Sequence, residues 1–205
     1  MVNKQNVSLD LGLFVFSWLV FLLGIVRGYQ KPFYSFYLFT RQTVLLINLY
    51  FLSKLLLKKD HKYFSFLCAL DSLMMMLIYF KNENRFLLAQ KTNFQVFVSI
   101  LEHYVLTTLF LLYYLIMDPT ILKLKNFYIG TIHLLVYFIT ALSLGHKYHY
   151  FPYDFLNPYY PFFWVKTVTL SSLTISMSFS LIYLKNQKVK WQMLKTKNNL
   201  IAITK

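Results

Sequence analysis

Seven polar side chains of this 205-residue sequence fall inside long apolar segments, where charges and hydrogen-bonding groups are costly. They are Thr40, Arg41, Asp71, Glu102, His103, His133 and Lys166. Ionisable residues inside a membrane-spanning segment are rare, pair with one another and mark functional sites. A hydroxyl, imidazoles and carboxylates are also the groups from which nucleophile–base pairs are assembled. We therefore expect any chemistry of this chain to involve this set.

The clearest example of costly polar residues in an apolar segment is 94–117, FQVFVSILEHYVLTTLFLLYYLIM. Its 24 residues suffice to cross a bilayer, which takes about 17–25 residues. Glu102 and His103 nevertheless lie about a third of the way along it. Neither group is needed for spanning, so we treat them as members of a functional site.

The composition indicates an integral membrane protein with a single domain. The sequence is 58% hydrophobic and only 14% charged, whereas a soluble domain is about a quarter charged. We predict an all-α fold, a polytopic bundle of six transmembrane helices over 1–184, followed by a basic cytoplasmic tail over 185–205. The predicted spans are 11–26, 33–57, 63–80, 94–117, 127–144 and 162–184. Every proline lies between these spans, so we expect continuous helices.

The distribution of positive charge predicts the orientation in the membrane. Six spans place 13 lysines on the side of the two termini and six lysines or arginines on the other side. Short cytoplasmic loops carry the excess of positive charge, so both termini are expected in the cytoplasm. The lysine-rich, alanine-poor composition suits an AT-rich bacterial genome, and the expected location is the bacterial plasma membrane.

The net charge of +14 also raises the question of partners. The lysines flank apolar segments, which is typical of membrane proteins, so we expect no nucleic acid. In the tail the lysines alternate with Trp191 and Leu194, which favours contact with anionic lipid headgroups. His146 and His149 have the spacing of a metal pair, but no further ligands cluster there, and we expect neither a metal nor a cofactor.

Four of the polar side chains should lie at similar depth below the outer surface. Thr40 is seven residues and His103 nine residues into spans that begin outside, which corresponds to about 10–14 Å. Asp71 and His133 lie nine and eleven residues from the outer ends of their spans. Lys166 lies closer to the surface. Five helices would thus bring polar groups to one layer.

The charges of this layer balance, since Arg41 and Lys166 stand against Asp71 and Glu102. Each costs about 2.5–3.5 kcal/mol at the centre of a membrane helix, so mutual pairing is expected. Two interpretations follow. The cluster is either a structural set of ion pairs that holds helices together or a functional site. A lone membrane threonine ordinarily bonds back to its own helix, which favours the structural interpretation for Thr40.

Three stretches resemble the androgen-induced-gene family of six-span membrane hydrolases and its short bacterial relatives. They are YLFTRQT at 37–43, LEHYVL at 101–106 and FPYDFLNP at 151–158. The resemblance implies an intramembrane threonine nucleophile, Thr40, and a histidine base, His103. It also implies a fatty acid ester of a hydroxy fatty acid as the substrate and no cofactor.

The chemistry of these residues is consistent with that implication. A threonine hydroxyl becomes a good nucleophile only when a neighbouring base removes its proton, and burial keeps an imidazole neutral and able to accept it. We expect Asp71 to orient His103, because Glu102 points about 100° away around the same helix. Arg41 would pair with Glu102 or hold a substrate carboxylate.

Two other functions use the same polar layer. A non-enzymatic lipid-binding or transport protein would use it as a headgroup site, and an acyltransferase would pass the acyl group to an acceptor other than water. Membrane lipids are partners in all three interpretations, and a lipid ester is the substrate in the first.

Overall fold

The computed structural model describes residues 4–28, 36–89 and 92–203, and this part of the chain is helical without strands. The helices are α1 (Lys4–Arg27), α3 (Phe39–Leu57), α4 (Lys62–Ala89), α5 (Asn93–Ile100), η1 (Leu101–Val105), α6 (Leu106–Ile116), η2 (Leu124–Asn126), α7 (Phe127–Tyr148), η3 (Asp154–Leu156) and α8 (Phe163–Ile203). The predicted all-α fold is confirmed.

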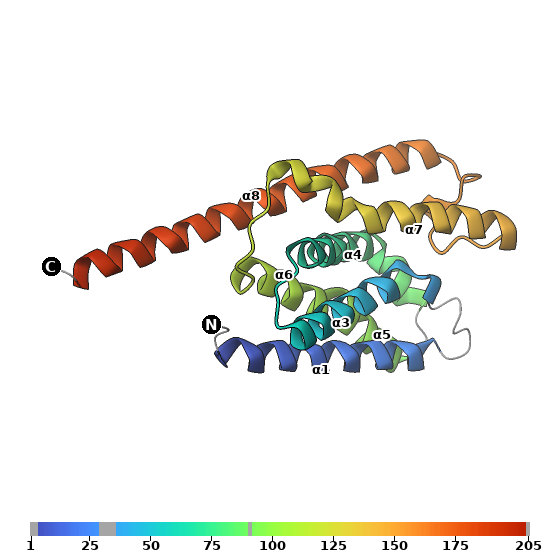
Figure 1. Ribbon diagram of the computed structural model, residues 1–205. Coiled ribbons are helices and arrows are strands. Elements are labelled where there is room, and N and C mark those ends of the chain that lie inside the picture. Colours follow the sequence, from blue (N-terminus) through green and yellow to red (C-terminus); the bar gives the residue numbers. More distant parts are fainter. Residues whose placement is uncertain (1–3, 29–35, 90–91, 204–205) are drawn as a thin grey trace.

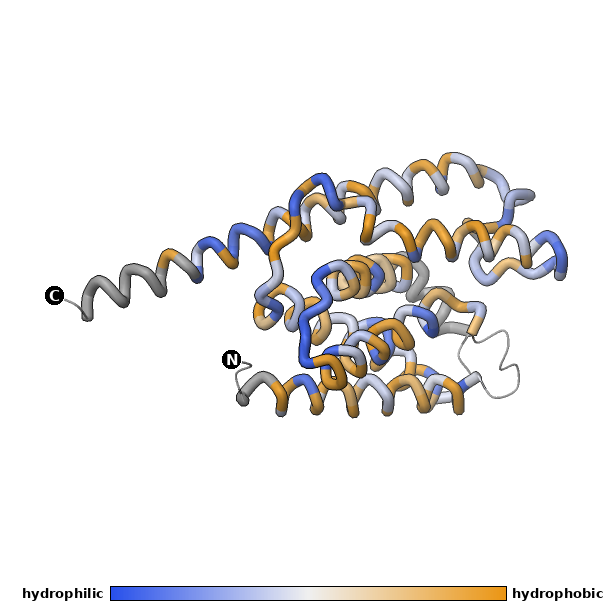
Figure 2. The backbone as a smooth tube through the Cα atoms, viewed as in Figure 1, coloured by the Kyte–Doolittle hydropathy of each residue, from blue (hydrophilic) through white to orange (hydrophobic). Residues whose placement is uncertain are grey.

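Helices α1 and α8 lie on opposite sides of the bundle, and α3, α4 and α7 lie between them (Figure 1). Helix α1 packs on α3, α4 contacts α3, α6 and α7, and α8 lies mainly on α7. The two ends of the chain lie at the same end of the bundle, and the loop between α7 and α8 lies at the other (Figure 1). Apolar residues follow the helices, while polar residues gather in loops and beyond the bundle (Figure 2).

Five helical stretches of the described residues are long and apolar enough to cross a membrane. They are Val7–Arg27, Lys62–Phe80, Asn93–Ile116, Leu124–Tyr148 and Phe163–Gln192. The segment predicted at 33–57 is not among them. Its described helix, α3, has 19 residues and carries Arg41, Gln42, Asn48 and Lys54, and its predicted first residues, 33–35, lie outside the described part.

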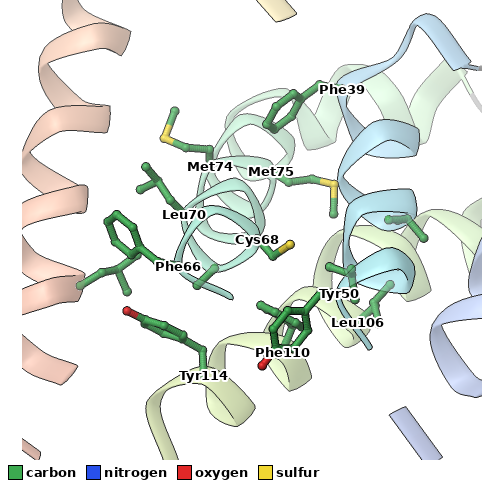
Figure 3. Close-up of a cluster of buried hydrophobic side chains, with 14 of the residues drawn as sticks. Phe39, Tyr50, Phe66, Cys68, Leu70, Met74, Met75, Leu106, Phe110 and Tyr114 are labelled. Atoms are coloured by element: carbon green, nitrogen blue, oxygen red, sulfur yellow. The ribbon is translucent and has the colours of Figure 1, made fainter. Parts of the chain in front are cut away.

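Helices α3, α4 and α6 meet in a core of large side chains (Figure 3). Phe51 and Phe110 pack edge to face with ring centroids 5.7 Å apart, and Tyr50 packs in the same way on Phe110 at 5.6 Å. Met74 and Met75 of α4 are buried further along the cluster, and Met74 faces α8, where Thr174 Oγ1 lies 3.4 Å from its Sδ (Figure 3). Lipid tails are as apolar as these residues, so close packing rather than removal from water holds such helices together.

Two helices differ from the predicted segments in ways that matter below. The predicted span 94–117 contains five residues in π-helical conformation, Leu101–Val105, between α5 and α6. The predicted last span, 162–184, continues as a helix through the predicted tail to Ile203. With 41 residues α8 is about 60 Å long, twice the hydrocarbon thickness, and it projects beyond the bundle (Figure 1).

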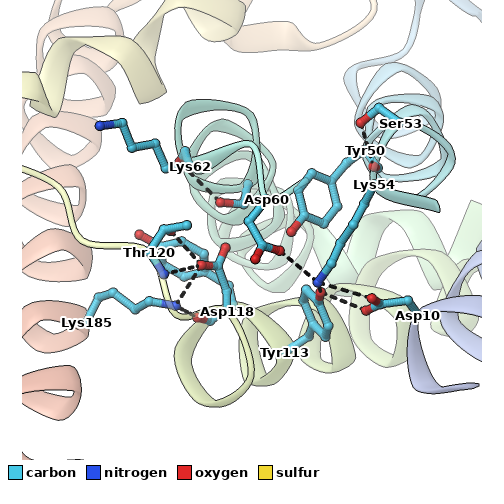
Figure 4. Close-up of polar contacts among 12 residues, drawn as sticks. Asp10, Tyr50, Ser53, Lys54, Asp60, Lys62, Tyr113, Asp118, Thr120 and Lys185 are labelled. Carbon is cyan, nitrogen blue, oxygen red and sulfur yellow. Dashed lines mark hydrogen bonds and ion pairs between the residues drawn. The ribbon is translucent and has the colours of Figure 1, made fainter. Parts of the chain in front are cut away.

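A cluster of ion pairs ties the helices together at the end where the two chain ends lie (Figure 4). Lys54 Nζ lies 3.1 Å from Asp10 Oδ2 and 2.9 Å from Asp60 Oδ1, and it also donates to the Tyr113 hydroxyl. This lysine joins α1, α3 and α6 at one point. We call Asp10, Lys54, Asp60 and Tyr113 the Lys54 cluster.

Candidate active site

Thr40 and His103 come together in the interior near the opposite end of the bundle. Thr40 Oγ1 lies 3.0 Å from His103 Nε2, and both residues are buried. Thr40 is the second residue of α3, and His103 lies in the middle of the π-helical turn η1. The two residues are therefore held by separate helices, at hydrogen-bonding distance, as a nucleophile and its base must be.

A backbone carbonyl sets the protonation pattern of His103. Its Nδ1 lies 2.9 Å from the carbonyl oxygen of Ser99, four residues earlier. A carbonyl oxygen only accepts, so Nδ1 carries the proton, and in the neutral ring Nε2 is left as an acceptor. The Thr40 hydroxyl consequently donates to Nε2, the direction in which a base would remove its proton. The Tyr79 ring stacks on the imidazole with centroids 4.0 Å apart and helps to fix its plane.

Asp71, which we expected beside His103, contacts His133 instead. Asp71 Oδ2 lies 2.5 Å from Nδ1 of His133, whose Nε2 lies 3.2 Å from Gln42 Oε1. The prediction that Asp71 orients His103 is therefore wrong. Helix α4 lies between α3 and α7, and the Asp71 side chain is on the face toward α7.

The π-helical turn carries both Glu102 and His103. A π turn inserts an extra residue into an α-helix and often coincides with a functional site. Here the altered ladder is supported by Thr107, whose hydroxyl donates to the His103 carbonyl oxygen at 2.5 Å. Neither glycine nor proline occurs in the turn, so the sequence contains no marker for it.

Glu102 is enclosed by two arginines. Arg27 Nη2 lies 3.1 Å from Glu102 Oε2, and Arg41 forms the second ion pair with the same carboxylate. Arg41 also donates to the carbonyl oxygen of Gly24 at 2.6 Å, and a Cβ at Gly24 would overlap Arg41 and Glu102. The structure thus shows the pairing of Arg41 with Glu102 that was one of the two expectations for Arg41.

Arg27 belongs to the site although sequence reasoning placed it in a loop. It is the last residue of α1, and it donates to the hydroxyl of Ser99, the residue whose carbonyl orients His103. Its position directly after the predicted first span, 11–26, was the available signal. Two guanidinium groups and one carboxylate leave an excess positive charge beside the Thr40–His103 pair.

Lys166 does not join this charge cluster. Its Nζ lies over the Tyr160 ring, 4.7 Å from the centroid, near the start of α8. The expected balance of Lys166 with Asp71 and Glu102 is wrong. The stem of a lysine in the first turn of a helix extends toward the preceding loop, and here it carries the charge away from the bundle interior.

One cavity reaches the Thr40–His103 pair, and a second cavity shares part of its lining. The smaller, of about 20 Å³, is lined by Thr40, His103 and Arg27 among others. The larger, of about 320 Å³, lies between α7, α8 and the loop that joins them, and its lining is mostly apolar. Phe39, Ile78 and Tyr153 line both. These three side chains therefore border both the small cavity with the reactive groups and the larger apolar cavity.

Fold and site together define a helical protein of membrane type with a buried threonine–histidine pair beside an apolar cavity. No family model matches the chain, and no curated protein or solved structure matches it either. What this site does must therefore be argued from its geometry.

Proposed function

We propose that this protein is an integral membrane lipid-ester hydrolase with Thr40 as nucleophile and His103 as general base. The observation that carries the proposal is the 3.0 Å contact of Thr40 Oγ1 with His103 Nε2, on an imidazole whose other nitrogen is held by a carbonyl. A hydroxyl held in this way is activated to attack a carbonyl carbon brought within reach.

The reaction follows from these positions. Thr40 Oγ1 bonds to the ester carbonyl carbon while its proton passes to His103 Nε2, and the carbonyl oxygen becomes an oxyanion. The tetrahedral species then breaks the bond to the alcohol oxygen, which takes the proton from His103. A water molecule then gives a proton to His103 while the water oxygen bonds to the acyl carbon. The bond to Thr40 Oγ1 breaks, and Thr40 takes the proton back from His103 and becomes a hydroxyl again.

The cavities support a lipid substrate and hydrolysis. An acyl chain fits the chemistry of the apolar cavity of about 320 Å³, and the shared lining residues would lead the ester group to Thr40. The smaller cavity, of about 20 Å³, is large enough for one water molecule, which needs about 10–15 Å³. Room for water favours hydrolysis over transfer to a bulkier acceptor.

The excess positive charge supports a substrate that carries an anionic group. Arg27 lines the small cavity, whereas Arg41 is enclosed by Gly24 and Glu102. Arg27 is therefore the cation available to a substrate carboxylate, and Arg41 would serve to hold Glu102. This arrangement suits a fatty acid ester with a free carboxylate, as the family resemblance implied.

The proposal includes six spans, with α3 as the sixth, and both termini in the cytoplasm. The polar side chains of α3 are compatible with a buried membrane helix because neighbouring helices satisfy them. Asn48 accepts a hydrogen bond from Ser17 of α1 at 2.6 Å, and Arg41 is paired with Glu102. The tail part of α8 would then lie against anionic headgroups, with Trp191 and Leu194 exposed.

Cysteine labelling in intact cells tests this orientation. The single native cysteine, Cys68, is buried and gives little background. A reagent that cannot cross the membrane should label a protein carrying Tyr159→Cys and spare one carrying Lys59→Cys. Labelling of Lys59→Cys alone would reverse the orientation and place the site near the cytoplasmic face.

Turnover of a long-chain ester by purified protein tests the proposed reaction. The wild type should hydrolyse the ester, and Thr40→Ala should not. Thr43→Ala is the matched control, because Thr43 is buried on the same helix but one turn further on. Loss in Thr40→Ala with retention in Thr43→Ala supports the nucleophile. A folded wild type that binds the ester in the cavity without turnover would instead indicate the lipid-binding function.

A further inference from the structure

Tyr153 projects from the loop between α7 and α8 into the space where a substrate would react. It directly precedes η3, and its ring stacks on Phe155 with centroids 5.3 Å apart and meets Tyr137 edge to face at 6.5 Å. It lines the small cavity together with Thr40 and His103, and it lines the apolar cavity as well. Tyr153 thus stands where the two cavities meet.

The Tyr153 phenol lines the small cavity beside the start of α3, close enough to the Thr40 side chain and to the backbone of Phe39 and Thr40 for each of them to influence it. The Thr40 proton is directed to His103 Nε2, so between the two hydroxyls Tyr153 is the donor. Phe39 and Thr40 are the first two residues of α3, whose N–H groups have no partner within the helix.

Burial raises the pKa of the Tyr153 phenol above its usual value. The phenol therefore keeps its proton at neutral pH and remains a donor. A donor fixed beside the nucleophile is what acyl transfer requires, because the carbonyl oxygen gains a full negative charge as the nucleophile attacks.

We propose that Tyr153 is a catalytic residue that donates a hydrogen bond to the ester carbonyl oxygen as it becomes the oxyanion. The inference rests on the proposed hydrolase function. When Thr40 Oγ1 bonds to the carbonyl carbon and loses its proton to His103, the carbonyl π electrons move to the carbonyl oxygen, which becomes a stronger acceptor than the ether-type Thr40 Oγ1. The Tyr153 O–H then turns from Thr40 Oγ1 to that oxygen without losing its proton. Collapse of the tetrahedral species restores the C=O bond and the original hydrogen bond.

A purely structural role would be carried by the ring, since the ring makes the contacts with Phe155 and Tyr137. Tyr153→Phe keeps those contacts and removes only the hydroxyl. Tyr159→Phe is the matched control, because Tyr159 is in the same loop but 76% exposed, with its hydroxyl 3.3 Å from His146 Nδ1.

The experiment measures kcat and KM for a long-chain ester, and the rate of covalent labelling by a fluorophosphonate, on full-length protein in detergent. Loss of one oxyanion donor lowers kcat by about 10²–10³-fold, so Tyr153→Phe should show this loss with an unchanged KM. Its labelling rate should also fall, because the P=O oxygen occupies the oxyanion position. Tyr159→Phe should match the wild type in both.

Wild-type kcat and labelling rate in Tyr153→Phe would overturn the inference and leave the proposed hydrolase intact. A wild type that neither labels nor turns over would overturn both, and it would do so before any Tyr153 variant is needed. If Tyr153→Phe does not accumulate as folded protein, fluorotyrosine at position 153 keeps the hydroxyl and changes its acidity. An unchanged kcat with fluorotyrosine would also contradict the role of Tyr153.

Discussion

Helices α1 and α3 each contribute to two polar clusters at opposite ends of the bundle, and the two clusters differ in the sign of the charge that is in excess. Helix α1 supplies Asp10 to the Lys54 cluster and Arg27 to the site, and α3 supplies Lys54 and Arg41. Arg41 and Lys54 are 13 residues apart, about 20 Å along the helix. In the Lys54 cluster one lysine is shared by two carboxylates and a phenol. At the site one carboxylate is shared by two arginines.

The difference is the one we would expect between a structural cluster and the site of the proposed function. The Lys54 cluster consists of ion pairs that connect helices, and its acids outnumber its cation. The site has an excess cation, a hydroxyl on a neutral imidazole and a cavity that reaches them. Ion pairs explain the first region completely. They do not explain why the second contains Thr40, His103 and open space.

The largest contrast is expected in activity. Thr40→Ala, His103→Ala and the double variant should each lower kcat by about 10⁴-fold or more, and the double variant should be no worse than either single one, because the pair acts as a unit. Lys54→Met, at the other end, should retain kcat once folded. Additive losses from Thr40→Ala and His103→Ala would mean that the two residues do not cooperate.

The next largest effect is expected in stability at the site. Glu102→Gln leaves the Arg27 and Arg41 guanidinium groups buried beside each other without a counter-charge. Removing one partner of a buried ion pair costs roughly 3–5 kcal/mol in soluble proteins, and the loss here should be of that order. Thermal unfolding in detergent measures it. A variant as stable as the wild type would show that Glu102 does not compensate the two arginines.

A smaller loss of stability is expected in the Lys54 cluster. Asp10→Asn leaves Lys54 with Asp60 and Tyr113, so the remaining charge is still compensated. The cost should be about 1–3 kcal/mol, the range for a buried polar group that loses its partner, and therefore below that of Glu102→Gln. The reverse order of the two variants would contradict the proposed difference between the clusters.

The smallest effect is expected for Lys166. Its charge lies over the Tyr160 ring rather than on a carboxylate, and such a contact is worth about 0.5–1 kcal/mol at an exposed site. Lys166→Gln should change the unfolding temperature little and leave kcat unaltered. A large loss of stability or of kcat would mean that Lys166 does belong to the charge cluster around Glu102.

Sequence reasoning predicted the helices and the meeting of Thr40 with His103 because both depend on position along the chain. Depth below the surface follows from counting residues, and facing helices bring equal depths together. The partner of Asp71 could not be predicted in this way, because it depends on how α4 is rotated between α3 and α7. Two further features have no sequence marker: the π turn that presents His103, and the inward course of the loop that brings Tyr153 to Thr40.

Arg27 illustrates a different limit. Hydropathy assigns a charged residue at the end of an apolar segment to the adjoining loop. The side chain of an arginine is long enough to reach back into the bundle, and here it reaches Glu102 and Ser99. Residues within one turn of a predicted boundary therefore belong among the candidates for a membrane site.

Covalent labelling by a fluorophosphonate, with the modified residue identified by mass spectrometry, tests whether His103 activates Thr40. We expect an adduct on Thr40 in the wild type, the same adduct in Thr43→Ala, and none in His103→Ala. An adduct on another residue, or labelling of Thr40 that persists in His103→Ala, would contradict this activation.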